Sequence, residues 1–237
     1  MVSNYYFNCF SCQARSKSEW CKLTNEEVDL LNRAKIGREY RANDFIYTQG
    51  EESEGIYCVE SGVVGLRKLN EEGKSPLVRL HGPGKTLGYR SFLTQSKHLL
   101  TAEVLKPAHV CFIPSKSAHD LLTSNPLLGL HLLQQKIEDL SEADERFTHT
   151  VTNSVRLRLL HVLLVLSERF GHRDRSNEYV IDLPLSRKDL ASLIGVEPES
   201  LSRIVRQLQA AGIANFNGRR VHIHDVNAVF DELEQVA

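Results

Sequence analysis

The chain has 237 residues, of which 41% are hydrophobic and 25% are charged, and its net charge is −1 at pH 7. This composition is typical of a globular protein, and the net charge argues against broad, non-specific affinity for nucleic acid. No segment approaches the roughly 18 consecutive apolar residues that a membrane-spanning helix needs, and the N-terminus lacks the features of a secretory signal. We therefore expect a cytoplasmic protein without a membrane partner, whose five cysteines are thiols or metal ligands rather than disulfides.

The first predicted region is a cysteine-containing arm over residues 1–25. Cys9 and Cys12 form a CxxC motif, and Cys21 follows after eight intervening residues. Three thiols in a polar segment indicate a metal site, and CxxC is the usual way to bring two thiolates to one face of a [4Fe–4S] cube. No histidine stands close enough to Cys9 and Cys12 for a typical zinc finger. A thiol redox sensor without metal is the alternative.

A small all-β domain is predicted over residues 26–125. Short apolar runs alternate with glycines, which is the pattern of an antiparallel sandwich or barrel. Cys58 lies in one of these runs and is interpreted as a core thiol. The glycines at Gly50, Gly62 and Gly84 stand where this region resembles the jelly roll of cyclic-nucleotide-binding domains. The expected strands are Phe45–Gly50, Gly55–Val59, Ser61–Arg67, Pro76–Leu80 and His109–Ile113.

The resemblance to those domains does not extend to their nucleotide-binding residues. Members that bind cAMP carry Gly-Glu-Leu, followed after a loop by an arginine that grips the cyclic phosphate. Here the first motif reads Gly88-Tyr89-Arg90, and Leu99-Leu100-Thr101 stands at the second. Tyr89 replaces the carboxylate that would hold the ribose hydroxyl. We therefore expect a vestigial pocket and no binding of cAMP.

A long helix is predicted over residues 126–150, because apolar residues recur there at steps of three and four. The apolar stripe is narrow, which favours a seam between two helices over a fully buried core helix. The alternative is a helix that lies along its own β-domain. The residues expected at a dimer interface are Leu130, Leu133, Ile137, Leu140 and Phe147.

The last region, residues 151–237, is predicted to hold a helix over about 154–170, a polar loop at Gly171–Asn177 and then two short helices joined by a tight turn. Ser186 and Asp189 match a capping box at the start of the first short helix. Gly195 supplies the turn, and Pro198 suits the first position of the next helix. A capped helix, a glycine turn and a second helix together predict a helix-turn-helix.

The second short helix has two different faces. Helical spacing places Leu201, Ile204, Val205 and Leu208 on one side and the polar residues on the other. Arginine can donate two hydrogen bonds to guanine, and a carboxylate can accept one from cytosine, so the polar side is predicted to enter a major groove. The candidate residues on this side are Glu199, Ser200, Ser202, Arg203 and Arg206.

A two-stranded wing is predicted after the second short helix. Asn217-Gly218 stands between two strand-like runs, and this pair is a strong hairpin signal. Arg219 and Arg220 would lie at the tip. They are either phosphate contacts or solubilising turn residues.

Glu199-Ser200-Leu201-Ser202-Arg203 resembles the E-x-x-S-R recognition helix of Crp/Fnr transcription regulators, and in particular of the Fnr branch. The resemblance implies a homodimer that reads a TTGAT-like inverted repeat in double-stranded DNA through Glu199, Ser202 and Arg203, with RNA polymerase as a further partner. It also implies Cys111 as the fourth ligand of a [4Fe–4S] cluster with Cys9, Cys12 and Cys21. The spacing of eight residues before Cys21 is one longer than that branch shows.

The predicted protein is therefore α+β, with an N-terminal jelly-roll sensor domain, a long dimerisation helix and a C-terminal winged helix-turn-helix. Its predicted function is sequence-specific transcription regulation in response to oxygen or redox state. The alternative is a regulator of the same family that responds to another small ligand, or to none. An enzyme with a jelly-roll active site is not expected, because His81, His98 and His109 show no grouping with carboxylates.

Overall fold

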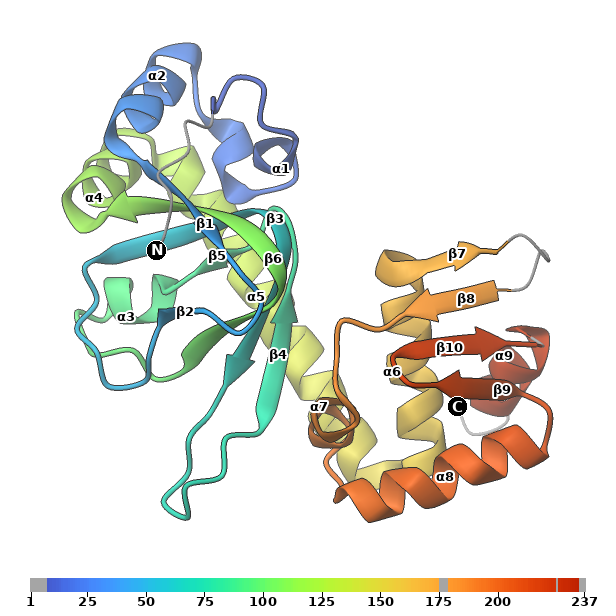
Figure 1. The fold of residues 1–237 in the computed structure, drawn as a ribbon. Coiled ribbons are helices and arrows are strands. Elements are labelled where there is room, and N and C mark those ends of the chain that lie inside the picture. Colours follow the sequence, from blue (N-terminus) through green and yellow to red (C-terminus); the bar gives the residue numbers. More distant parts are fainter. Residues whose placement is uncertain (1–7, 175–178, 225, 235–237) are drawn as a thin grey trace. The chain divides into compact units, whose positions relative to one another are not determined.

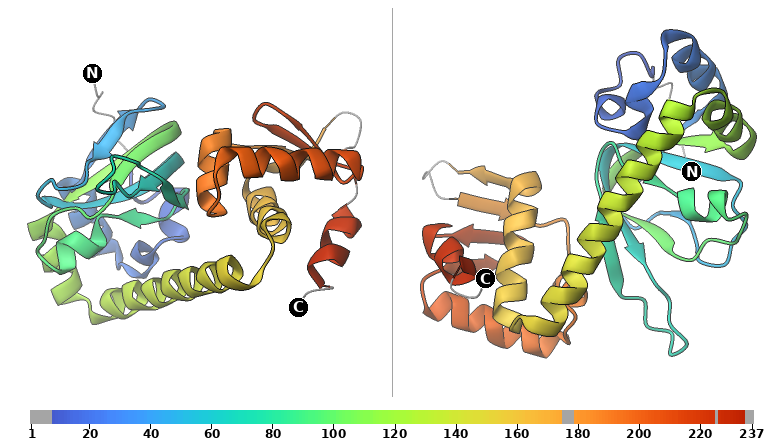
Figure 2. Two further views of the ribbon diagram at one scale, coloured as in Figure 1. Left: turned by 90° about the horizontal axis from the view of Figure 1, so that it is seen from below. Right: turned by 180° about the vertical axis from the view of Figure 1, so that it is seen from behind.

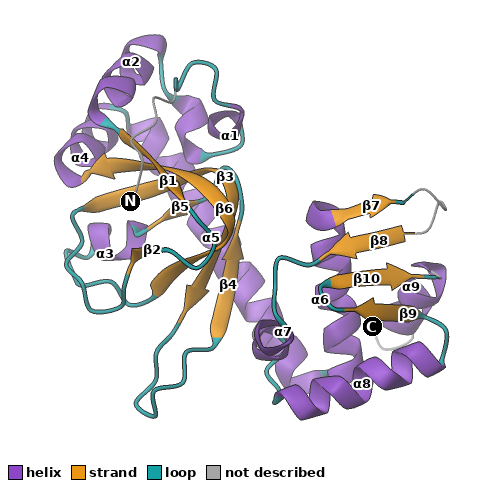
Figure 3. Ribbon diagram, viewed as in Figure 1, coloured by secondary structure: helices purple, strands orange, loops and turns teal. Residues whose placement is uncertain are grey.

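The computed structural model describes residues 8–174, 179–224 and 226–234. The chain divides into two compact units, Met1–Ser141 and Glu142–Ala237, and each is described by itself (Figure 1). The division falls inside α5, a continuous helix over Pro126–Thr152 (Figure 2). The α+β class and the order of sheet domain, long helix and helix-turn-helix are confirmed (Figure 3). No helix among the described residues is long and apolar enough to cross a membrane.

The first unit begins with three short helical segments that pack against a sheet. Trp20 is 3% exposed and donates a hydrogen bond from Nε1 to Thr86 Oγ1 at 3.2 Å. Thr24 and Glu27 form a capping box at the start of the longest of these helices. The predicted arm therefore joins the hydrophobic core that Trp20 shares with Ile56 and Ile113. The segments are α1 (Gln13–Ser16), the 3-10 helix η1 (Glu19–Lys22) and α2 (Asn25–Ala34).

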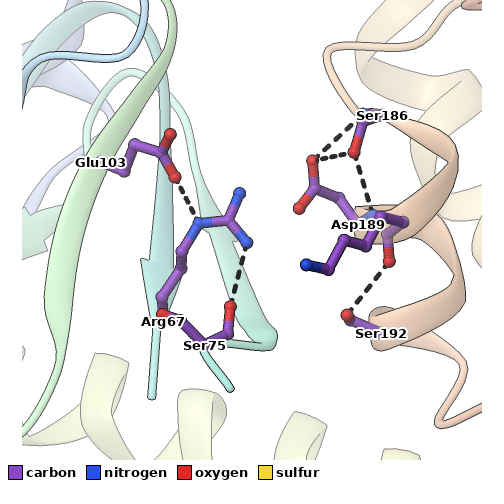
Figure 4. Close-up of polar contacts among 7 residues, drawn as sticks. Arg67, Ser75, Glu103, Ser186, Asp189 and Ser192 are labelled. Carbon is purple, nitrogen blue, oxygen red and sulfur yellow. Dashed lines mark hydrogen bonds and ion pairs between the residues drawn. The ribbon is translucent and has the colours of Figure 1, made fainter. Parts of the chain in front are cut away.

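The sheet of the first unit is antiparallel, with the strand order β1-β6-β3-β4; β2 also pairs with β6, and β5 with β3. Its inner face encloses a core that includes Val59, Val64 and Val104. Arg67 donates hydrogen bonds to Glu103 on the neighbouring strand and to the Ser75 carbonyl (Figure 4). The strands are β1 (Ile36–Tyr40), β2 (Phe45–Tyr47), β3 (Gly55–Arg67), β4 (Leu77–His81), β5 (Thr86–Leu87) and β6 (Thr101–Pro114).

One long strand replaces the two that were predicted at Gly55–Val59 and Ser61–Arg67. The pairing of β3 with β6 shifts on both sides of Gly62, which has a φ of +87°. A Cβ at this position would lie 2.3 Å from the Pro107 carbonyl oxygen. The glycine therefore lets the strand continue through an irregularity. The sequence had predicted a break between two strands at this point. Two helices, α3 (Tyr89–Leu93) and α4 (Ser115–Ser124), complete the unit.

The second unit combines helices with a four-stranded sheet of order β7-β8-β10-β9. Gly171–Arg173 forms β7 and pairs with β8, so the polar loop predicted at Gly171–Asn177 begins as a strand; residues 175–178 lie outside the described residues. The predicted hairpin consists of β9 and β10, which lie at one edge of this sheet. The elements are α6 (Val155–Phe170), β7 (Gly171–Arg173), β8 (Tyr179–Asp182), α7 (Arg187–Leu193), α8 (Pro198–Ala210), β9 (Ala214–Asn217), β10 (Arg220–Ile223) and α9 (Val226–Glu234).

Candidate nucleic-acid interface and sensor cavities

The helix pair α7–α8 begins with the predicted capping box. Ser186 Oγ accepts a hydrogen bond from the Asp189 amide at 3.1 Å, and the Asp189 carboxylate accepts one from the Ser186 amide at 3.1 Å (Figure 4). The turn to α8 passes through Gly195, which has a φ of +67°. Pro198 occupies the first turn of α8, where its missing N–H has no helical partner to lose.

Arg158 on α6 also holds this turn, although it was not among the residues predicted for the site. One of its terminal guanidinium nitrogens donates a hydrogen bond to the Ile194 carbonyl at 2.6 Å. Ile194 is the residue that ends α7, so the guanidinium satisfies a carbonyl that has lost its helical partner. No local sequence pattern connects Arg158 with a turn more than thirty residues away.

The two faces of α8 differ as predicted. Leu201, Val205 and Leu208 are each at most 3% exposed, and they fix the helix to the unit. Ile204, which was predicted on the same side, is half-buried. The candidate base-reading residues Glu199, Ser202, Arg203 and Arg206 are exposed, and Ser200 is half-buried.

The polar side chains of α8 interact mainly with their own helix. Ser202 Oγ donates a hydrogen bond to the Pro198 carbonyl at 2.8 Å, which leaves its lone pairs available. Arg203 makes a long contact of 3.5 Å with Ser200 Oγ, and Arg206 Nε lies 3.4 Å from the Ser202 carbonyl. Among the described residues, no carboxylate forms an ion pair with either of these arginines. The guanidinium groups can therefore turn toward an outside acceptor at low cost.

The wing turns one residue later than predicted. Asn217 pairs with Arg220 across the hairpin, so the central residues are Gly218 and Arg219 rather than Asn217 and Gly218. Gly218 has a φ of +61°, and glycine at the first central position is the requirement of a type II′ turn. Arg219 is exposed at the tip. Arg220 is exposed too, but its Nε lies 3.0 Å from Asp182 Oδ1, so it is already paired.

Four of the five cysteines are brought to one cavity in the first unit. Cys9 and Cys12 from the arm and Cys58 and Cys111 from β3 and β6 line a space of about 40 Å³. Cys58 and Cys111 are direct partners on neighbouring strands, so their side chains share one face of the sheet. Burial raises the pKa of Cys9 and Cys58 above their ordinary values, and that of Cys111 to about 12.

Cys21 lies elsewhere. Its Sγ is 3.6 Å from His131 Nε2 on α5, and it does not line the cavity. The family resemblance implies a ligand set of Cys9, Cys12, Cys21 and Cys111, but these four cysteines do not lie together in this structure. Cys58 takes the place of Cys21 beside Cys9, Cys12 and Cys111. Among the described residues, no three histidine, cysteine or acidic side chains are arranged to hold a metal ion.

The arm that carries Cys9 and Cys12 is held by backbone hydrogen bonds. The Cys9 amide donates to Asn32 Oδ1 at 2.9 Å, and Arg15 Nε donates to the Cys9 carbonyl at 2.8 Å. These contacts fix Cys9 against α1 and α2, and Cys9 and Cys12 line the cavity with residues of β3 and β6. The two hydrogen bonds connect residues that are six and 23 positions apart, so no local sequence pattern reveals them.

The helix α5 has a buried face and an exposed face. Leu128, Leu132 and Asp139 are buried in the first unit, and the Asp139 carboxylate lies 3.2 Å from Lys85 Nζ and 2.9 Å from Lys136 Nζ. These contacts show that the helix does lie along its own β-domain. The five residues predicted at a dimer interface are on the exposed side, with exposures between 54% and 71%: Leu130, Leu133, Ile137, Leu140 and Phe147.

Comparison with known proteins agrees with this architecture. Residues 37–125 match the family described as cyclic nucleotide-binding domain, and residues 157–229 match the Crp-like helix-turn-helix domain. The anaerobic regulatory protein of Haemophilus influenzae is 25% identical over 93% of this chain and 86% of its own length. The transcriptional activator protein Anr of Pseudomonas protegens is 26% identical over 92% of this chain and 89% of its own length.

Solved structures share the fold. FixK2 from Bradyrhizobium japonicum superposes with a TM-score of 0.72 at 24% identity, covering 83% of this chain and 96% of that one. A transcriptional regulator of the CRP/FNR family from Thermus thermophilus gives 0.70 at 23% identity, covering 85% and 100%. With both domain matches in the order that the structure shows, the chain belongs to the Crp/Fnr family and is a DNA-binding transcription regulator.

Proposed function

We propose that the protein binds operator DNA as a homodimer and reads a TTGAT-like half-site with α8. The observation that carries this proposal is the exposed row of Glu199, Ser202 and Arg203 on a helix whose opposite face is buried. Arginine, a carboxylate and a hydroxyl are groups that discriminate base pairs in a major groove. Arg219, which is exposed at the wing tip, would contact phosphate and add affinity without sequence preference.

Dimerisation is supported by the exposed stripe of α5. Five large apolar side chains that are more than half exposed form a heptad-like row, and such a row is stabilised when it packs against a second copy. A dimer would present two α8 helices to the two halves of an inverted repeat. One relative is named a transcriptional activator, which supports RNA polymerase as a further partner.

The test is a gel-shift titration against the inverted repeat and its single-base variants. Arg203→Ala should weaken operator binding by about 1–3 kcal/mol and relax discrimination at the guanine. Arg219→Ala should weaken all sequences alike and reduce the salt dependence. Arg33→Ala, in the first unit on α2, is the matched control and should change neither. Unchanged selectivity in Arg203→Ala would remove the base-reading role.

A response to oxygen or redox state is proposed to act through the thiols of the cysteine cavity, Cys9, Cys12, Cys58 and Cys111. The support is their gathering from three distant segments and the anaerobic regulators among the relatives. Among the described residues no three histidine, cysteine or acidic side chains are arranged to hold a metal ion, so the proposed response uses the thiols themselves.

A preparation without oxygen tests which cysteines bind a cluster. The measured quantities are the iron and sulfide content of the protein and its affinity for the operator. Loss of bound iron in Cys21→Ser but not in Cys58→Ser would establish the set implied by the family. The reverse pattern would establish the cavity set. Iron-free protein whose operator affinity still falls in air, and does so less in Cys58→Ser, would establish a response of the thiols themselves. Equal operator affinity with and without oxygen would exclude the redox role and leave the DNA-binding proposal intact.

A further inference from the structure

Two histidines meet where α5 passes into α6, in the second unit. His149 lies in the last turn of α5 and His161 in the second turn of α6, and their rings meet edge to face with the centroids 4.6 Å apart. Both side chains are half-buried. Among the described residues, none makes a hydrogen bond or an ion pair with a ring nitrogen of this pair. The nitrogens can therefore bind a group from solution.

The distance between the two rings suits a shared metal ion. Imidazole nitrogens bind Zn²⁺ at about 2.0–2.1 Å, so two rings on one ion have their centroids roughly 4.5–5.3 Å apart at coordination angles of about 90–110°. The observed 4.6 Å lies within this range. The edge-to-face orientation does not yet point both nitrogens at one place, but rotation about χ2, a soft torsion in histidine, can do so.

The charges around the pair favour a cation. Glu145 stands four residues before His149 on α5 and so shares its side of the helix. Burial lowers the pKa of His161, and His149 lowers it further, whereas the Glu145 carboxylate acts in the opposite direction. His161 is therefore neutral at pH 7, which is the form of imidazole that binds metals, and a carboxylate that favours positive charge on its ring also favours a bound cation.

Two arginines stand one turn before the histidines in the sequence, and both have partners of their own. Arg146 lies 3.7 Å from the Glu142 carboxylate. Arg158 donates a hydrogen bond to the Ile194 carbonyl at 2.6 Å. Neither guanidinium occupies an imidazole nitrogen of the pair.

We propose that His149 and His161 together bind one divalent transition-metal ion, of the kind represented by Zn²⁺ and Ni²⁺, with water completing its coordination. Imidazole suits these ions, whereas Mg²⁺ and Ca²⁺ prefer oxygen ligands. The described residues hold no set of three histidine, cysteine or acidic ligands, so the site has two protein ligands and Glu145 contributes charge. The bound ion would tie the last turn of α5 to α6. The proposal goes beyond operator recognition and uses none of the base-reading residues.

The test is calorimetric titration of the full chain with nickel chloride. Absorption spectra recorded in parallel distinguish the ligands, because nickel bound by thiolates gives an intense sulfur-to-metal charge-transfer band and nickel bound by imidazoles does not. One binding event without this band should be weakened in His149→Gln and in His161→Gln, each by at least the roughly tenfold that loss of an outer-shell partner already costs a metal site. The double variant should bind about as weakly as either single variant, because one imidazole cannot chelate the ion.

Three controls accompany this titration. His119→Gln, at an exposed histidine of α4, should leave the event unchanged, and magnesium chloride should not produce it. Nickel should also protect His149 and His161 of the unsubstituted protein from modification by diethyl pyrocarbonate, read by mass spectrometry. This measurement does not depend on how well the variants fold.

Four results would overturn the proposal. Binding that keeps its affinity in both single variants would place the nickel elsewhere. A further, independent loss in the double variant would indicate two separate histidine sites. Equal binding of magnesium would reduce the event to attraction by surface carboxylates. Equal modification of the two histidines with and without nickel would show that the ion does not reach them. Because none of these measurements uses DNA, their failure is distinct from failure of the operator proposal.

Discussion

In the second unit, the polar groups with a proposed role in operator recognition project outward from one helix, whereas in the first unit thiols from separate segments line one cavity. Arg203 is separated from Glu199 by one helical turn, so helical geometry alone sets their spacing. Cys9 and Cys111, by contrast, come from distant segments and meet only after the arm packs on the sheet. The row of polar residues on α8 forms wherever the helix forms. The cysteine cavity forms only when the core of the first unit is packed.

The largest expected effect concerns the cysteine cavity and is the slow reaction of a buried cysteine with a thiol reagent. Burial raises the pKa of Cys111 from 9.0 to about 12, which lowers its thiolate fraction at pH 8 about a thousandfold. Ellman's reagent should therefore modify Cys111 at least about tenfold more slowly than an exposed thiol, because the higher nucleophilicity of a high-pKa thiolate offsets part of the lost thiolate fraction. The half-buried Cys12 and Cys21 should react first, and Cys12→Ser should remove one fast thiol. If Cys111→Ser removes a fast thiol, the cavity is open to solvent and the contrast with the exposed helix fails.

A core substitution behind α8 should destabilise the second unit and leave the stability of the first unit unchanged. Leu201 is fully buried, and Leu201→Ala should cost about 2–5 kcal/mol through lost burial and a cavity. The midpoint of urea unfolding, monitored by far-UV circular dichroism, should shift to a lower urea concentration. The fluorescence of Trp20, the single tryptophan of the sequence, reports on the first unit and should keep its midpoint.

The exposed Leu69→Ala in the first unit is the matched control for this experiment, and it should move neither transition. A Trp20 midpoint that moves together with the circular dichroism in Leu201→Ala would show that the two units unfold as one block. The local site on α8 and the cysteine cavity would then depend on the same folding transition.

A smaller effect is expected from the helix cap. Ser186→Ala should cost about 1 kcal/mol, because the hydroxyl accepts a hydrogen bond from an amide that has no helical partner. Ser192→Ala is the matched control on the same helix: its hydroxyl donates to the Lys188 carbonyl at 3.1 Å, which already belongs to the helix, so little should change (Figure 4). Equal losses in both variants would show that the cap adds no specific stability.

These two regions also differ in how much of them the sequence predicts. Ser186, Gly195 and the apolar back of α8 follow local rules, and the structure has them as expected. The stripe of α5 was recognised for the same reason. The turn of the wing moved by one residue, because Asn217 and Gly218 are both suited to turns and strand pairing decides between the two alternatives.

The arrangement of the cysteine cavity could not be predicted in this way. Spacing grouped Cys21 with Cys9 and Cys12, but Cys21 falls in η1 and faces His131. Cys58 was assigned to the core, and the pairing of β3 with β6 places it opposite Cys111. Which thiols meet depends on strand register and on how the arm packs, and neither leaves a local pattern in the sequence.

The smallest predicted effect tests an ion pair that ties α9 to α6 within the second unit. Arg156 donates hydrogen bonds to both carboxylate oxygens of Glu232, at 2.8 and 2.6 Å, and these bonds hold the pKa of Glu232 below its ordinary value of 4.5. A carboxylate with a lowered folded pKa adds stability above its unfolded pKa and loses it as the pH falls through the folded one. Glu232→Gln should therefore lower the unfolding free energy by about 0.5 kcal/mol at pH 7, since the pair is partly solvated, and by less as the pH falls below 4.5. Urea midpoints from circular dichroism at several pH values measure this, with the exposed Glu72→Gln of the first unit as the control. A difference that stays constant between pH 7 and pH 3 would show that the ionised pair does not hold α9.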